Sequence, residues 1–151
     1  MTFPREDILR RLIEIAETIP GIKTVAWDVI SVNDDQLPAI AVLEGDEEAN
    51  EDDRINRPTN APRRVVMMPH IIIVAGRNIG SPPLDIGPAL NSFYRLLLKA
   101  IMTDSTLAGL TLDGRGVRLV GMESDLAHGR MMQGQMAVKI ALTYGLVPNN
   151  L

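Results

Sequence analysis

Residues 136–146 read MAVKIALTYGL, and every second position from Met136 to Leu146 carries a large apolar or aromatic side chain. Small or polar residues, such as Lys139 and Thr143, occupy the positions between them. Because successive side chains of a β-strand point to opposite faces, this alternation predicts a strand with one buried face. Such a strand belongs to a sheet whose apolar face is covered by another layer of structure.

Two amphipathic helices are predicted to supply that layer. Pro4 fits the first turn of the first helix, behind a possible cap at Thr2, and Pro20-Gly21 ends it. The second helix begins at Ser81 or Asp85 and ends near Thr103, with a further turn through Leu107 and Leu110. Apolar side chains recur at helical spacing, in the first helix at Ile8, Leu12, Ile15 and Ile19 and in the second at Ile86, Leu90, Phe93, Leu97 and Ile101.

Four further strands are expected, at residues 23–30, 38–43, 63–75 and 117–122. Pro69 interrupts the third of the five strands and predicts an edge position or a bulge there. The element order is then α-β-β-β-α-β-β, within a single domain that spans residues 1–151. This order predicts an α+β fold, with a mainly antiparallel or mixed sheet and both helices on one face.

Between the second and third strands the composition changes. Residues 44–53 hold seven acidic side chains and no basic one, and the stretch to Pro62 adds two prolines and little apolar surface. A segment of this kind buries too little to offset the entropy lost on ordering. We therefore expect a long solvated loop at about residues 44–62.

The composition excludes several classes of function. The chain has no cysteine, which excludes disulfide frameworks, thiolate catalysis and cysteine-rich zinc sites. Its net charge is −4, and no basic face with stacking aromatics is visible, so neither nucleic acid nor an anionic membrane is an expected partner. No apolar run reaches the roughly 20 residues of a membrane span, and the start lacks a signal-peptide pattern. We expect a domain that folds inside the cell.

No complete catalytic, cofactor or metal site is predicted. His70 lies within an expected strand, and Asp125 with His128 would make an acid–base pair that has no nucleophile. The glycines of residues 76–81 lack the lysine and third glycine of phosphate-binding loops. Asp46, Glu48 and Asn50 alternate like calcium ligands, but no glycine follows at the required position. We expect a protein that is not an enzyme.

The order of these elements resembles that of the tail terminators, or minor tail protein U-like proteins, of long-tailed bacteriophages and prophages. The similarity runs along nearly the whole chain, in pattern and order rather than in a chemical signature. It is carried by residues 5–12 (REDILRRL), 37–40 (LPAI), 44–47 (EGDE), 68–73 (MPHIII), 85–91 (DIGPALN), 124–126 (SDL) and 141–144 (ALTY).

The resemblance implies a structural protein without catalytic residues, cofactor or metal. It implies a hexameric ring on the head-proximal end of the tail, which ends polymerisation of the tail tube and provides the surface to which the head docks. The expected partners are further copies of the chain, the tail tube protein and a head-completion or connector protein. The expected location is the virion, reached from the host cytoplasm during assembly.

Two other functions remain open from the sequence. A head–tail connector or neck protein would bind the portal or capsid side. A ferredoxin-like small-molecule sensor would hold a ligand between subunits and be stabilised by a metabolite. In such a ring, the long charged loop and an exposed strand edge are the expected contact sites, through paired charges or strand addition. We predict in particular that acidic side chains of one copy meet arginines of the next. The residues assigned to this contact are Asp46, Glu47, Glu48, Asp52, Asp53, Arg63 and Arg64.

Overall fold

A computed structural model of the chain describes residues 3–28, 34–49, 61–76, 86–125 and 133–151. In these residues the element order confirms the α+β fold and the expected succession, and the further turn expected through Leu107 and Leu110 forms a separate short helix. The helices and strands, in chain order, are α1 (Pro4–Glu17), β1 (Thr24–Trp27), β2 (Ala39–Ala49), β3 (Arg63–Gly76), α2 (Ile86–Thr103), α3 (Ser105–Leu110), β4 (Arg118–Asp125) and β5 (Gln133–Leu146). The single-turn 3-10 helices are η1 (Asp34–Gln36), η3 (Leu112–Gly114) and η4 (Pro148–Asn150).

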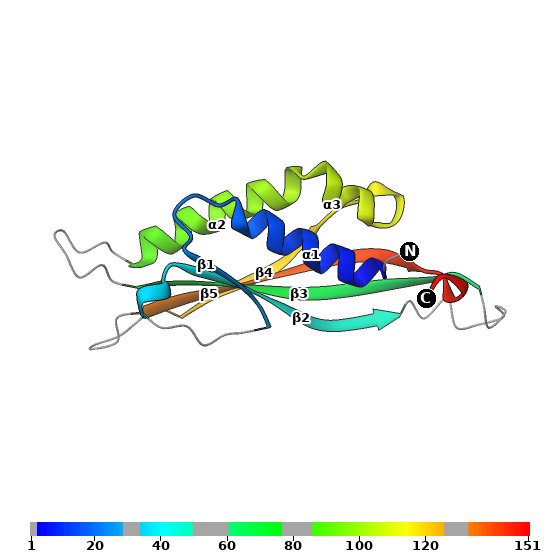
Figure 1. The fold of residues 1–151 in the computed structure, drawn as a ribbon, viewed down its shortest axis with the longest axis horizontal. Coiled ribbons are helices and arrows are strands. Elements are labelled where there is room, and N and C mark those ends of the chain that lie inside the picture. The colour runs from blue at the N-terminus through cyan, green and yellow to red at the C-terminus, as the bar shows by residue number, and fades with distance from the viewer. Residues whose placement is uncertain (1–2, 29–33, 50–60, 77–85, 126–132) are drawn as a thin grey trace.

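The strands form one sheet in the order β1-β2-β3-β5-β4. β1 runs parallel to β2, and the other three pairs are antiparallel, so the sheet is mixed. Helices α1, α2 and α3 all lie on the same face of this sheet (Figure 1). The expected placement of the helices on one face is therefore confirmed. β1 and β4 are the two edges of the sheet in the described residues.

The main core lies between the helices and the sheet. On β5, Met136, Val138, Ile140, Leu142 and Tyr144 are all buried, which confirms the alternation read from the sequence. Full burial of one large apolar side chain contributes about 1.5–3 kcal/mol, so this row alone stabilises the fold strongly. The helices and central strands meet it with Ile8, Leu9, Leu12, Leu90, Leu97, Ile101, Ile40, Met67, Ile71 and Ile73.

A second, smaller apolar cluster lies on the other face of the sheet. It consists of Leu37, Ala39, Ala41, Ile72 and Val74. This face carries no α-helix of the described residues. Further along this face the sheet carries polar residues such as His70 and Lys139, both half-buried.

Pro69 lies in the central strand of the sheet, so the edge position expected for it was wrong, but the bulge was right. The ladder between β2 and β3 shifts register between Leu43 and Asp46, opposite Pro69. Gly45 provides the extra residue with φ 68°, and a Cβ atom there would overlap the carbonyl oxygen of Met68. A proline without an N–H is accommodated in a central strand because the bulge breaks the regular ladder opposite it.

The acidic segment is not a solvated loop along its whole length, as was expected. Residues 44–49 continue β2, and Asp46 to Ala49 pair with Met68 to Val65 of β3. The pairing satisfies backbone groups, while Asp46, Glu47 and Glu48 stay exposed and Glu44 is half-buried beside Arg5. Residues 50–60, including Asp52 and Asp53, lie outside the described residues.

The remaining boundaries differ from expectation by a few residues. β1 is shorter than residues 23–30, because Asp28 adopts φ 59° directly after Trp27. α1 begins at Pro4 with Phe3 at its N-cap, and α2 begins at Ile86. The caps expected at Thr2, Ser81 or Asp85 lie outside the described residues.

Candidate interaction surface

The residues considered for catalysis do not form a site in the part of the chain that the structure describes. His70 lies on β3 next to Lys139 of β5. Lys139 donates to Glu123 Oε1 at 2.9 Å, which lowers the pKa of that glutamate. Asp125 ends β4, while His128 and the glycine segment after Gly76 lie outside the described residues. No group of metal-ligating side chains occurs among the described residues.

A cluster of charged and aromatic side chains joins the start of α1 to β2 and β5. Arg5 Nη1 lies 3.1 Å from Glu47 Oε1, and Arg5 Nη2 lies 3.4 Å from Glu44 Oε1. The hydroxyl of Tyr144 donates to Glu47 Oε1 at 2.7 Å, and the Tyr144 ring meets Phe3 edge to face. Burial and the bond to the carboxylate both raise the pKa of Tyr144.

Glu44 has a second carboxylate close by. Its backbone N–H donates to Asp28 Oδ1 at 3.1 Å. A hydrogen bond between the two side chains, burial, and repulsion from Asp28 raise the pKa of Glu44, while Arg5 lowers it. The pair lies where β1 ends and β2 continues alone, so it marks the point at which the sheet edge passes from one strand to the other.

The structure separates the acidic residues assigned to the subunit contact. Glu47 points to the helix side and bonds within its own chain, to Arg5 and Tyr144. Asp46 and Glu48 are exposed on β2. Whether any of them contacts another copy stays a prediction.

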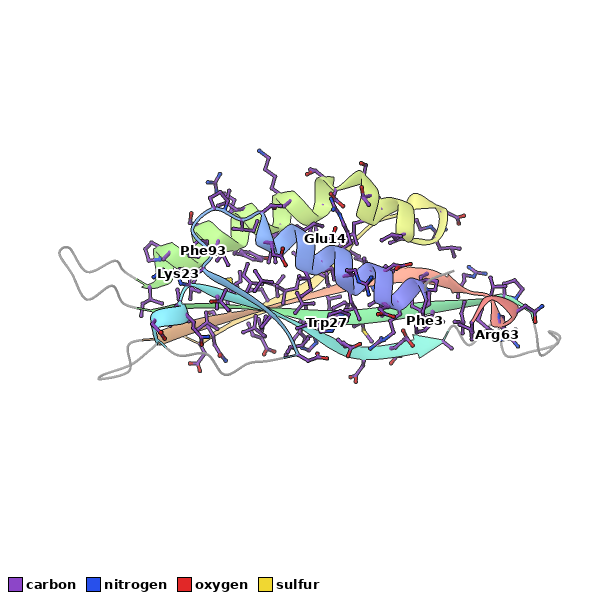
Figure 2. All side chains as sticks on the ribbon, viewed as in Figure 1. Phe3, Glu14, Lys23, Trp27, Arg63 and Phe93 are labelled. Carbon is purple, nitrogen blue, oxygen red and sulfur yellow. The ribbon has the colours of Figure 1, made fainter. Side chains whose placement is uncertain are left out.

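Arg63 and Arg64 begin β3, at the same end of the sheet as the acidic part of β2. They pair through their backbones with Leu146 and Gly145 of β5. Figure 2 shows Arg63 at this end, beside the carboxyl-terminal η4 turn. Acids and arginines therefore lie on neighbouring strands of one chain, which the sequence did not indicate.

The β4 edge exposes apolar side chains that were not among the residues predicted to form a contact. Leu119, Val120 and Met122 are 37%, 50% and 39% exposed, although a strand in a sheet usually buries one face. Arg118 precedes them and Glu123 follows. Every residue of β4 except the half-buried Gly121 is exposed. The available signal was the broken alternation of residues 118–123, RLVGME, compared with the regular one of β5.

The opposite edge of the sheet exposes aromatic side chains around a pocket. Phe3 and Trp27 are each 37% exposed. Figure 2 shows Phe3 at the start of α1 and Trp27 beneath the same helix. Between them lies a surface pocket of about 220 Å³, lined by Phe3, Arg5, Glu6, Leu9, Trp27 and Glu44. The two edges of the sheet are thus unlike, one with protruding apolar side chains and one with a recess rimmed by acids.

A comparison with models of known protein families and with curated proteins found no match to this chain. Among the described residues, no helix is both long and apolar enough to cross a membrane. The resemblance to tail terminators therefore rests on the sequence pattern alone.

Proposed function

We propose that the protein is a structural subunit that assembles into a ring on the head-proximal end of a phage tail tube. There it ends tube polymerisation and provides the surface to which the head docks. The observation that carries the proposal is the pair of unlike exposed edges. A head-to-tail contact between two different patches closes a ring of identical subunits when the rotation per subunit divides a full turn.

Two further observations support this proposal. The order of helices and strands is the one on which the resemblance to tail terminators was based. Apolar side chains exposed in a row, such as those of β4, are typical of surfaces that bind another protein.

The test combines native mass with an assembly assay. Light scattering across a range of protein and salt concentrations is expected to show a hexamer, or a monomer that becomes one as concentration rises. The protein is then added to tail tube subunits during polymerisation. We expect shorter tubes with the protein at one end, seen by electron microscopy. A dimer that never grows, or tubes of unchanged length, would overturn the proposal.

Experiments on the same purified protein distinguish two alternative functions from the ring. A head–tail connector would bind portal rings and leave tube length unchanged. A small-molecule sensor would use the pocket beside Trp27, but ligand sites are typically about 300–1,000 Å³. At about 220 Å³ the pocket is smaller than that range. Thermal stabilisation by a metabolite would favour the sensor over the ring.

A further inference from the structure

Residues on the two edges of the sheet lie at corresponding positions along the strand direction. Trp27 pairs with Val42 of β2, and Val42 pairs with Ile71 of β3. Ile71 pairs with Val138 of β5, and Val138 pairs with Met122 of β4. Trp27 and Met122 are therefore the two ends of one row of paired residues that crosses the whole sheet.

A second row carries opposite charges at its two ends. Asp46 pairs with Met68 on β3, and Arg118 pairs with Ala141 on β5. The register of β3 with β5 is the same on both sides of this point, at Met67 with Leu142 and at His70 with Lys139. Met68 therefore lies opposite Ala141. The carboxylate of Asp46 and the guanidinium of Arg118 thus lie on opposite edges of the sheet, at the same position along the strand direction.

In each row, the two end residues also lie on the same face of the sheet. Leu119 and Met122 pair with Ile140 and Val138, whose side chains belong to the core under the helices. Trp27 lies on that face too, because its pocket is completed by Leu9 and Phe3 of the helix layer. The charged row lies on the other face, since Met68 and Ala141 alternate with the core-facing Met67 and Leu142.

The strand directions allow one sheet to continue into the next. β2, β3, β5 and β4 alternate in direction, so β4 runs antiparallel to β2 and to β1. A second copy moved sideways would set its β4 antiparallel to this edge. Beyond Trp27, the described strands leave the outer side of residues 46–49 of β2 without a neighbouring strand. Such an edge accepts an added strand.

We propose that the β4 edge of one copy docks against the β1–β2 edge of a second copy. Leu119 and Met122 then pack into the recess between Phe3 and Trp27, and Arg118 faces Asp46. The occupant is a second copy because one chain carries both halves of the match, in the same rows and on the same faces. This contact rests on the proposed ring, since a head-to-tail contact repeated around an axis closes one.

Charge reversal tests the contact without touching the core. R118D and D46R each place like charges at the same point, so each is expected to raise the dissociation constant of the oligomer about tenfold or more. Both side chains are exposed, which leaves the folded monomer intact by circular dichroism. K99D makes the same charge change as R118D on the exposed side of α2; it is the matched control for R118D and is expected to assemble like the unaltered protein.

Restoration is the sharper measurement. The double variant D46R/R118D is expected to recover association, and so is a mixture of the two single variants, because every contact then brings opposite charges together again. A contact unrelated to these groups would give no recovery in either case, and that result would overturn the proposal.

A further variant tests the apolar half of the contact. M122E introduces a charge into the recess. It is expected to abolish assembly both in the otherwise unaltered chain and in the D46R/R118D double variant. If the unaltered protein assembles and every variant assembles equally well, the edge contact is wrong while the ring stands. If the unaltered protein stays monomeric at all concentrations, the proposed ring falls as well.

Discussion

At the scale of single residues, the bulge in β2 depends on a glycine that has two separate constraints. Gly45 adopts φ 68°, which side-chain-bearing residues rarely do, and a Cβ there would overlap the Met68 carbonyl. We expect Gly45→Ala to lower the free energy of unfolding by about 2 kcal/mol or more, measured by urea denaturation.

Two other glycines allow the cost of a positive φ to be measured apart from the cost of a steric overlap. Gly114 has φ 65° but open space around it, so Gly114→Ala tests the backbone strain alone, for which we expect about 1 kcal/mol. Gly121 has neither a positive φ nor a close neighbour, and Gly121→Ala is expected to change little. If Gly45→Ala and Gly114→Ala lowered the free energy of unfolding equally, the overlap of the new Cβ atom at position 45 with the Met68 carbonyl would relax at no cost.

The hydroxyl of Tyr144 is a second single-residue feature with a measurable effect. It is almost fully buried and donates to Glu47, which Arg5 also holds. Tyr144→Phe keeps the packing and removes one hydrogen bond to a charged group, so we expect a loss of about 1.5–3 kcal/mol in thermal or urea unfolding. A decrease in the free energy of unfolding of less than about 0.5 kcal/mol would mean that the ion pair with Arg5 holds Glu47 without the tyrosine hydroxyl.

At the scale of elements, Asp104 connects α1 to α3 in two ways. It accepts two hydrogen bonds from Arg11, at 2.9 and 2.7 Å, and caps α3 by accepting from the Leu107 N–H. The bond from Arg11 and the cap lower the pKa of Asp104 in the folded protein. Its stabilising contribution is therefore present above the unfolded pKa of about 3.9 and is lost as pH falls through the lower folded value.

Two substitutions at this position separate the cap from the ion pair. Asp104→Asn keeps a good capping residue and removes the charge, so we expect lower stability at neutral pH and a flatter loss of stability below pH of about 4. Asp104→Ala also removes the cap, which costs about 1 kcal/mol more. The check is the unfolding midpoint measured across pH. An unchanged acid profile for the asparagine variant would contradict the assignment.

Elements with a strong period were predictable from the sequence, and the acidic end of β2 was not. The alternation from Met136 to Leu146 gave β5 its buried face, because burial there is decided by side chains. Asp46 to Ala49 carry no apolar pattern, yet they form a strand because backbone pairing with Val65 to Met68 holds them. That pairing partner lies far along the chain, so no local signal marks it.

The candidate surface was predictable only in part, for a related reason. The sequence marked Asp46 and Glu48 as exposed charges, since such groups rarely lie in a core. It did not show that Arg118 lies in the same row as Asp46, because that relation runs across four strands and two register shifts. The exposure of Leu119 and Met122 had one local signal, the broken alternation of residues 118–123, but that signal does not show which edge of the sheet the strand occupies.

At the scale of the whole molecule, two contacts compete for the exposed acids. In one, Asp46 and Glu48 meet Arg63 and Arg64 of the next copy, as the charge pattern of the sequence predicts. In the other, Asp46 meets Arg118 across the sheet edges. Because β3 is flanked by β2 and β5, its arginines lie at the end of the sheet and not at an edge. The first contact would therefore join copies end to end, and the second side by side.

The double reversal R63E/R64E, compared with R118D, decides between these arrangements. For a ring closed through the edges, we expect R118D to weaken association about tenfold or more and R63E/R64E to weaken it little, measured by sedimentation at matched salt. Raising salt should weaken the unaltered ring modestly, because exposed charges are screened while the packing of Met122 against the recess is not. If R63E/R64E dissolves the oligomer and R118D leaves it whole, subunits associate through the ends of their sheets, and the proposed edge contact is wrong.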